Sequence, residues 1–156
     1  MLRGVAAVGT VGGLGAVGSR AVAVIEEPGE YRIENGETVV VVRADGVVLD
    51  GQGRSLPTDV DVGIRVTGDG VTVRNFDLTD WTMNTTVDAT ALEFVGTTGG
   101  AVRNSDLRGG ARGILLDAVE GLTVRNVGSG RGGDGEALRA VDARGCRIRD
   151  CDSSLS

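Results

Sequence analysis

The stretch Gly70-Val71-Thr72-Val73-Arg74-Asn75 decides the fold, because the chain contains it several times. Each full copy opens with Gly, alternates apolar and other residues, and closes on Arg followed by Asn or Asp. The later copies are Gly99-Gly100-Ala101-Val102-Arg103-Asn104, Gly121-Leu122-Thr123-Val124-Arg125-Asn126 and Gly145-Cys146-Arg147-Ile148-Arg149-Asp150, and a degenerate first copy is Gly46-Val47-Val48-Leu49-Asp50-Gly51. The copies begin 24, 29, 22 and 24 residues apart. Such a period is typical of solenoid proteins, in which each repeat forms one coil.

A second apolar motif lies ahead of every copy. These motifs are Val39–Val42, Ile64–Val66, Leu92–Phe94, Ile114–Leu116 and Leu138–Ala140. Within both motifs apolar residues recur with a period of two, which indicates half-buried strands. We therefore expect each coil to run strand, turn, strand, two-residue turn, strand, loop. The sequence predicts an all-β protein, a parallel β-helix of about five coils.

Stacking these coils in register gives inward columns of mostly aliphatic residues. One coil cannot bury its own apolar face, but a stack that rises about 4.8 Å per coil can. The predicted columns are Ile64/Leu92/Ile114/Leu138, Val66/Phe94/Leu116/Ala140, Val73/Val102/Val124/Ile148, Phe76/Ser105/Val127/Cys151 and Leu78/Leu107/Ser129/Ser153.

One polar position closes the second strand of each coil. It is occupied by Asn75, Asn104, Asn126 and Asp150. Asn and Asp tolerate the left-handed conformation of a tight corner, and stacked Asn side chains can hydrogen-bond from coil to coil. We interpret these four residues as a structural ladder.

The repeat GVTVRN, with GIRV before it, resembles the right-handed β-helix repeat of pectate lyases, polygalacturonases and NosD-like periplasmic proteins. Residues 28–56 are similar to the opening of secreted haloarchaeal β-helix proteins. The resemblance covers roughly residues 24–156 and implies a single-stranded right-handed parallel β-helix. That superfamily contains lyases, hydrolases, binding modules and surface proteins, so the fold does not choose among them. This chain is shorter than the enzymes and lacks the His- and Lys-containing motifs of polygalacturonases.

The composition restricts the chemistry. All 16 basic residues are Arg, there is no Lys or His, and 22 acidic residues give a net charge of −6. This charge disfavours nonspecific binding to nucleic acid, and the lack of His removes the commonest general base and metal ligand. An acidic, Lys-free surface suits a halophile, although GC-rich coding alone also replaces Lys by Arg.

The N-terminus predicts export. Arg3 precedes an apolar, Gly-rich run over residues 4–18, and Ala21-Val22-Ala23 offers a cleavage site. This pattern is typical of a signal peptide at residues 1–23 and too short for a membrane span. The alternatives are an uncleaved anchor or a mis-started N-terminus. We expect a secreted or cell-surface β-helix domain at residues 24–156, without membrane insertion after cleavage. Alternatively, this domain is the truncated part of a longer solenoid that continues at its C-terminal end.

Two outward columns carry charge. Arg74, Arg103, Arg125 and Arg149 stack beside the corner, and Asp77, Asp106, Gly128 and Asp152 follow two residues beyond it. The columns form either a surface ion-pair network or, with Arg74, Arg103 and Arg125 exposed, a site for carboxylates or sulfates of an acidic glycan. Asp77 and Asp106, near 5 Å apart on adjacent coils, are either structural charges, which we favour in the absence of a third group, or candidate catalytic carboxylates of a retaining glycosidase or Ca²⁺ ligands. We otherwise expect neither cofactor nor metal.

The longest spacing contains an insertion at residues 80–88. Its Trp81, the only Trp, could stack on a sugar ring or cover the solenoid, and Asn84-Thr85-Thr86 fits an N-glycosylation sequon. The Gly/Asp-rich segment at residues 130–135 resembles a Ca²⁺ turn of the RTX proteins, but such turns work in tandem and only one is present, so we interpret it as a flexible loop. Cys146 and Cys151 fall at inward positions and are either free thiols or a disulfide.

These features favour an exported, non-catalytic β-helix module that presents a surface to a polysaccharide, another cell-surface polymer or a protein partner. The alternative is a carbohydrate-active enzyme of the pectate-lyase-like superfamily, a polysaccharide lyase or glycoside hydrolase. The last coil shows no closing cap, so end-to-end self-association is also expected.

Overall fold

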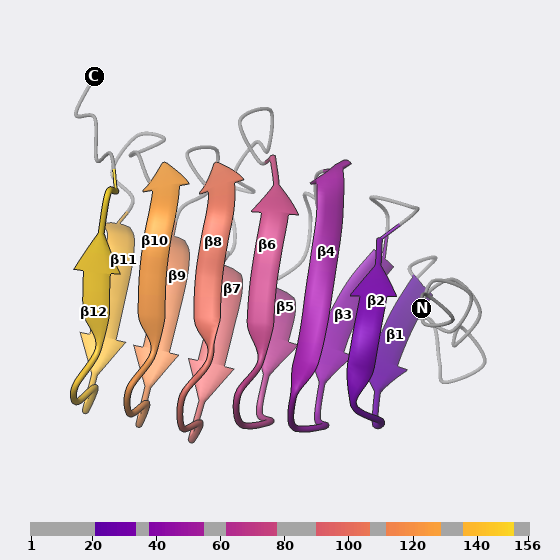
Figure 1. Cartoon of the computed structure of the whole chain (residues 1–156), viewed down its shortest axis with the longest axis horizontal. Coiled ribbons are helices and arrows are strands. Elements are labelled where there is room, and N and C mark those ends of the chain that lie inside the picture. The colour runs from indigo at the N-terminus through magenta and orange to yellow at the C-terminus, as the bar shows by residue number, and fades with distance from the viewer. Residues whose placement is uncertain are drawn as a thin grey trace.

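The computed structural model describes residues 21–33, 38–54, 62–77, 90–106, 112–128 and 136–151 (Figure 1). All regular structure in these ranges is β, and none of it is helical. The strands are β1 (Ala21–Ile25), β2 (Gly29–Arg32), β3 (Thr38–Val42), β4 (Val47–Arg54), β5 (Val62–Val66), β6 (Thr72–Phe76), β7 (Thr90–Val95), β8 (Ala101–Asp106), β9 (Arg112–Asp117), β10 (Thr123–Gly128), β11 (Glu136–Val141) and β12 (Arg147–Arg149).

Consecutive strands alternate between two parallel sheets. One sheet has the order β1-β3-β5-β7-β9-β11 and the other has the order β12-β10-β8-β6-β4-β2. Figure 1 shows the two sheets face to face, with tight turns joining each rear strand to the front strand of the same coil. This confirms the right-handed parallel β-helix. Each sheet has six strands, so the coil count differs slightly from the predicted five, because β1 and β2 form a coil ahead of the first recognised copy.

The predicted inward columns form the core of the middle coils, whereas their last members Ala140 and Ile148 are exposed, contrary to the prediction. Ile64 pairs with Leu92 and Leu92 with Ile114, while Val73, Val102 and Val124 stack in the other sheet. These side chains are at most 2% exposed. Period-two alternation therefore produces a continuous apolar core, because each strand presents one face to the opposite sheet. The column that begins at Leu78 lies outside the described residues.

The expected third strand does not exist as a separate element. Asn104 has a φ of 49° but lies within β8, so the corner bends one strand instead of dividing two. The same holds for Asn75 in β6 and Asn126 in β10. A left-handed residue redirects the chain and interrupts the backbone ladder only locally, because pairing resumes beyond it at Asp77 and Asp106. The sequence pattern could not distinguish this corner from a two-residue turn.

A second ladder holds the turns at the opposite end of the strands. The Asp69 N–H donates to Asp45 Oδ1 at 2.8 Å, and the Thr98 N–H donates to Asp69 Oδ1 at 2.8 Å. Each carboxylate thus accepts a backbone N–H of the next coil. These two Asp residues were not recognised in the sequence as structural.

The ends of the stack bear on two expectations. The expected cleavage site, Ala21-Val22-Ala23, lies in β1, which pairs with β3. This pairing does not test export, which stays a prediction. No helix in the described part of the chain is long and apolar enough to cross a membrane. In the last coil Cys146 and Cys151 are partly buried free thiols, which agrees with the first of the two alternatives.

Candidate functional site

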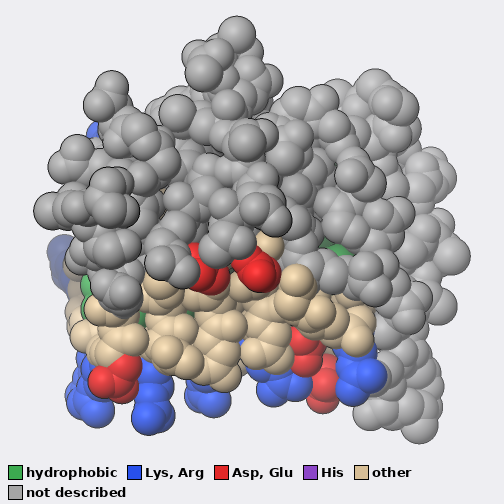
Figure 2. Space-filling model, turned by 90° about the horizontal axis from the view of Figure 1, so that it is seen from above, with side chains coloured by type: hydrophobic (Ala, Val, Ile, Leu, Met, Phe, Trp, Pro, Cys, Tyr) green, Lys and Arg blue, Asp and Glu red, His purple; other side chains and the backbone are tan. Residues whose placement is uncertain are grey.

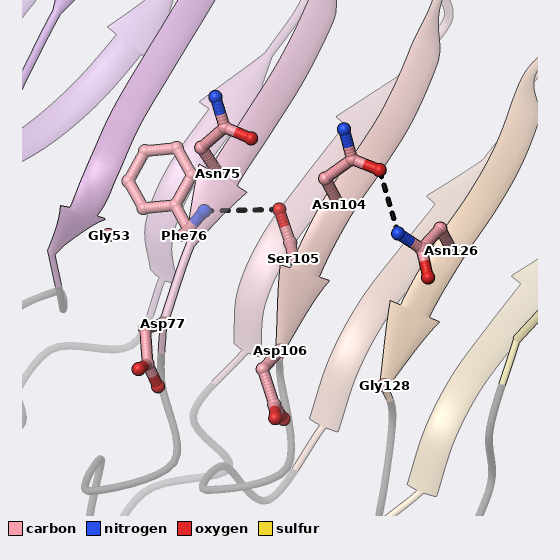
Figure 3. A pocket seen from close by; sticks show the side chains of 9 residues that line it. All are labelled: Gly53, Asn75, Phe76, Asp77, Asn104, Ser105, Asp106, Asn126 and Gly128. Carbon is pink, nitrogen blue, oxygen red and sulfur yellow. Dashed lines mark hydrogen bonds between the residues drawn. The ribbon is translucent and has the colours of Figure 1, made fainter.

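The corner residues form one edge of the solenoid. Asn75, Asn104, Asn126 and Asp150 have φ values of 60°, 49°, 52° and 52°, the left-handed conformation expected for them. The Asn126 Nδ2 donates to Asn104 Oδ1 at 2.8 Å (Figure 3), so at least part of this column is a hydrogen-bonded ladder. Each Asn directly follows the Arg of the outward column on its own coil. Because the coils are in register, the amides stand in a row at the edge of the sheet.

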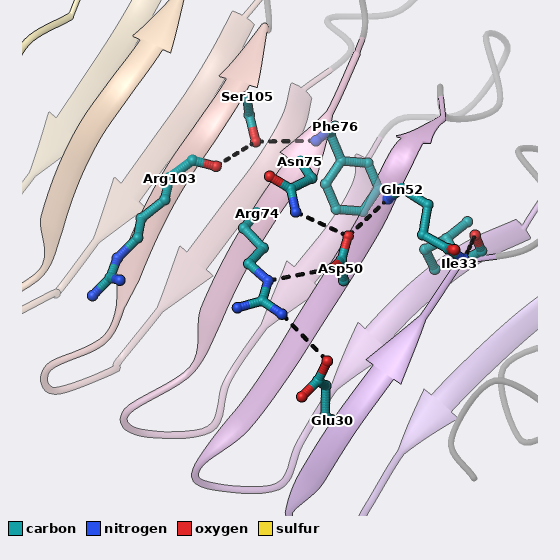
Figure 4. Close-up of polar contacts among 9 residues, drawn as sticks. All are labelled: Glu30, Ile33, Asp50, Gln52, Arg74, Asn75, Phe76, Arg103 and Ser105. Atoms are coloured by element: carbon teal, nitrogen blue, oxygen red, sulfur yellow. Dashed lines mark hydrogen bonds and ion pairs between the residues drawn. The ribbon is translucent and has the colours of Figure 1, made fainter. Parts of the chain in front are cut away.

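A buried hydroxyl joins the strands below this edge. Ser105 occupies an otherwise apolar column and is 4% exposed. Its Oγ accepts the Phe76 N–H at 3.2 Å and donates to the Arg103 carbonyl at 2.9 Å (Figures 3 and 4). The hydroxyl therefore bridges β6 and β8 where the left-handed corner interrupts their regular pairing.

A depression of about 420 Å³ lies over this edge. Its lining combines side-chain amides, carboxylates, one hydroxyl and the edge of one aromatic ring. The described lining residues are Gly53, Asn75, Phe76, Asp77, Asn104, Ser105, Asp106, Asn126 and Gly128. We call this depression the corner pocket. Phe76 is only 2% exposed, and the lining as a whole exposes polar and apolar surface in similar amounts.

The two candidate catalytic carboxylates lie at one side of the corner pocket. Asp77 and Asp106 form a parallel bridge between neighbouring coils, as the repeat predicts. In Figure 3 both side chains point to the same side of their strands. On the coil that follows Asp106, the aligned position is occupied by Gly128, so the column of carboxylates is interrupted at β10. The described residues contain no group of three or more potential metal ligands, and the Ca²⁺ alternative gains no support from them.

A third carboxylate, Asp50, organises the N-terminal side of the pocket. Its Oδ1 accepts the Gln52 N–H at 2.9 Å and the Asn75 Nδ2 at 3.1 Å, and its Oδ2 accepts the Arg74 Nε at 3.3 Å (Figure 4). Burial alone would raise the pKa of this carboxyl, but these donors and the Arg74 charge stabilise the carboxylate. The net result is a pKa below the ordinary value.

The arginine column lies on the outer face of the sheet that contains β2 to β12. Strand register aligns Arg74 with Arg103, Arg103 with Arg125, and Arg125 with Arg149. Seen from above, basic side chains stand in a row along one edge of the molecule, with acidic side chains among them (Figure 2). The column is therefore a physical row of guanidinium groups and not only a sequence pattern.

The partners of this column differ from the expected ones. Arg74 pairs with Asp50 at 3.3 Å and with Glu30 at 3.2 Å, both on earlier coils, whereas the sequence pattern suggested the Asp77 column. Arg125 lies 3.6 Å from Asp150, with both side chains more than 60% exposed. The reason is the register: Asp50 occupies the same column as the arginines, one coil before Arg74.

Several candidates lie outside the described residues: Trp81, Asn84, Asp152 and the segment 130–135. Their proposed roles stay predictions. Conversely, sequence reasoning missed the roles of Asp50 and Ser105. Both differ from the other residues of their columns: Asp50 is an acid in a column of arginines, and Ser105 carries a hydroxyl in a column of mostly apolar residues. That exception to the repeat was the available signal.

No known protein family matches the sequence, and no curated protein does so. Among solved structures, the fold is similar to that of a putative glycosyl hydrolase from Parabacteroides merdae, with a TM-score of 0.58 and 14% sequence identity. The similarity covers 88% of this chain and 80% of the other. At this identity the likeness shows the fold alone, and the haloarchaeal resemblance stays a prediction.

Proposed function

We propose that this protein is an exported, non-catalytic β-helix module that binds a polysaccharide at the corner pocket. The observation that carries the proposal is the lining of that pocket, where a row of Asn amides stands beside Asp77 and Asp106. Amides both donate and accept hydrogen bonds and carboxylates accept them, which matches the hydroxyl groups of a sugar. The volume of about 420 Å³ lies in the range of small-ligand sites.

The pocket is also preorganised. Asn104 and Asn126 are hydrogen-bonded to each other, Asn75 is held by Asp50, and Ser105 fixes the strands beneath. Side chains that are already ordered lose little entropy when a ligand binds. Because the lining repeats from coil to coil along the solenoid, an extended polymer suits it better than a compact ligand.

A second candidate function is polysaccharide hydrolysis. Asp77 and Asp106 are bridged neighbours on adjacent strands, which lie about 4.8 Å apart, close to the carboxyl separation of retaining glycosidases. The Parabacteroides merdae protein, described as a glycosyl hydrolase, adds support for this alternative. Against it, the described part of the pocket offers a single row of carboxylates and no third charged group to differentiate an acid from a nucleophile.

The deciding experiment measures binding and cleavage on the same samples. We expect soluble polysaccharides to retard the protein in affinity electrophoresis without release of reducing ends or unsaturated products. Replacing both carboxylates, Asp77→Ala with Asp106→Ala, should weaken retention, whereas Glu26→Gln, an exposed acid elsewhere, should not. Cleavage that disappears in Asp77→Asn or Asp106→Asn would establish the hydrolase, and no retention by any polysaccharide would contradict both functions.

A further inference from the structure

The charge on the outer face of the front sheet changes along the solenoid. Among the side chains that the structure describes on β2, β4 and β6, two arginines, Arg32 and Arg74, stand with two carboxylates, Glu30 and Asp50. On β8, β10 and β12 the aligned outward positions hold four arginines with one nearby carboxylate, that of Asp150. We call these four the arginine surface: Arg103, Arg125, Arg147 and Arg149.

The arginine surface is not neutralised as Arg74 is. Arg74 contacts two carboxylates and is about one-third exposed, whereas Arg125 is 65% exposed and lies 3.6 Å from one equally exposed acid. For Arg103 no ion pair is seen with any described residue, and its guanidinium extends away from the Asp50 network in Figure 4. These side chains therefore retain donors that a ligand can use.

Stacking like charges has a cost. Two unit charges about 5 Å apart in water repel by about 1 kcal/mol, and the column contains two such adjacent pairs, Arg103 with Arg125 and Arg125 with Arg149. The chain as a whole is acidic, with a net charge of −6, so a cationic row does not follow from composition. A row of arginines that has few carboxylate partners among the described residues is typical of a surface that receives its counter-charges from a ligand.

We propose that the arginine surface binds the carboxylate or sulfate groups of an acidic saccharide. This inference rests on the proposed function, because Arg103 and Arg125 directly precede Asn104 and Asn126 of the corner pocket. Guanidinium groups bind such anions through paired N–H donors, and the column presents them at about the coil spacing of 4.8 Å. Thr72, Ala101 and Thr123 form the neighbouring outward column. Thr72 and Thr123 are half-buried and Ala101 is only 5% exposed, so Arg103 and Arg125 are the exposed side chains beside them.

Nucleic acid fits this surface less well. Binding of single strands combines phosphate contacts with base stacking on aromatic rings, and the outward columns of β6, β8, β10 and β12 contain no aromatic residue. The net negative charge of the chain also opposes a long polyanion. We therefore assign the ligand as a saccharide.

The test compares three probes on the intact protein: dextran, dextran sulfate and polygalacturonate. We expect the two anionic polymers to bind more tightly than dextran, with an affinity that falls as salt is raised. Arg103→Gln should weaken anionic binding about fivefold and leave dextran binding unchanged. The matched control is Arg43→Gln, an exposed arginine on another face, which should change neither.

Each outcome has a distinct meaning. Equal affinity for dextran and dextran sulfate, with no effect of Arg103→Gln, would overturn this inference and leave the proposed function intact. Absence of binding to all three polymers would overturn both. Single-stranded DNA that displaces dextran sulfate at lower concentration than polygalacturonate does would overturn the saccharide assignment. Thermal unfolding of each variant checks that its fold is retained.

Discussion

At the corner of each coil, one backbone torsion angle determines which residues the position accepts. Asn104, with a φ of 49°, lies in the left-handed region that Asn tolerates and β-branched residues avoid. Its amide also accepts a hydrogen bond from Asn126. The sequence predicted the identity and conformation of this column because the requirement is local. It did not predict that Asp50 supports the first amide, because that contact depends on which coil lies alongside.

Asn104→Val should lower the free energy of unfolding by about 1–3 kcal/mol, since it adds left-handed strain and removes the amide. Asn104→Gly is the matched control: it accepts the same φ and loses only the side chain, so its effect should be smaller. Urea unfolding measures both. Equal stability of the Val variant and the wild type would contradict the assigned corner.

Asp50 should make stability depend on pH. Its folded-state pKa is lowered from 3.8, so its ionised form stabilises the fold above that pH. The contribution is lost as pH falls through the folded-state pKa. We expect Asp50→Asn to be less stable than the wild type at pH 7 and the difference to shrink near pH 3. A difference that stays constant between pH 7 and pH 3 would show that the charge of Asp50 has no role.

At the scale of the strand, the repeat predicted which residues face inward but not where strands bend. β8 continues through its corner because Ser105 supplies a hydrogen bond to Phe76 where the backbone ladder is interrupted. From sequence alone, Ser105 is only a polar exception in a column of mostly apolar residues. Only the neighbouring strand reveals that it completes the pairing.

Ser105→Ala should destabilise the protein by about 1–3 kcal/mol, because it leaves the buried Phe76 N–H without its acceptor. Thr67→Val is the matched control. The Thr67 hydroxyl donates to the Val42 carbonyl, which also accepts the Thr67 N–H, so its loss leaves no group unpaired. Thermal unfolding should show a clear decrease for the first variant and little for the second. Equal decreases would refute the bridging role.

At the scale of the whole molecule, coils with the same repeat differ in the burial of their apolar residues and in their surface charge. Burial is high through the middle of the stack, yet Ile148 of β12 is 54% exposed and Val141 of β11 is 41% exposed. The arginine surface extends over β8, β10 and β12, so it shares only β12 with these exposed residues. The fold was predictable because every coil repeats its pattern. The pocket was predictable only in part: its Asn and Asp columns follow from the repeat, whereas the role of Ser105 departs from it.

The exposed apolar residues of the last coil lead us to expect self-association, which stays a prediction. Light scattering should show mass increasing with protein concentration, and replacing Val141 and Ile148 together by Ser should reduce that increase, because their burial drives the contact. A constant monomer mass across micromolar concentrations would contradict the expectation. Arg43→Gln, which leaves the apolar surface unchanged, serves as the control.

The central claim is that a saccharide lies on the corner edge of the solenoid. The most direct test is an NMR titration with an acidic oligosaccharide, following the side-chain amides of Asn75, Asn104 and Asn126 and the Arg103 Hε. We expect these resonances to shift together and to saturate, while the backbone amides of β1 and β3 stay unchanged. Saturable shifts confined to other strands, or no shift at millimolar ligand, would contradict the central claim.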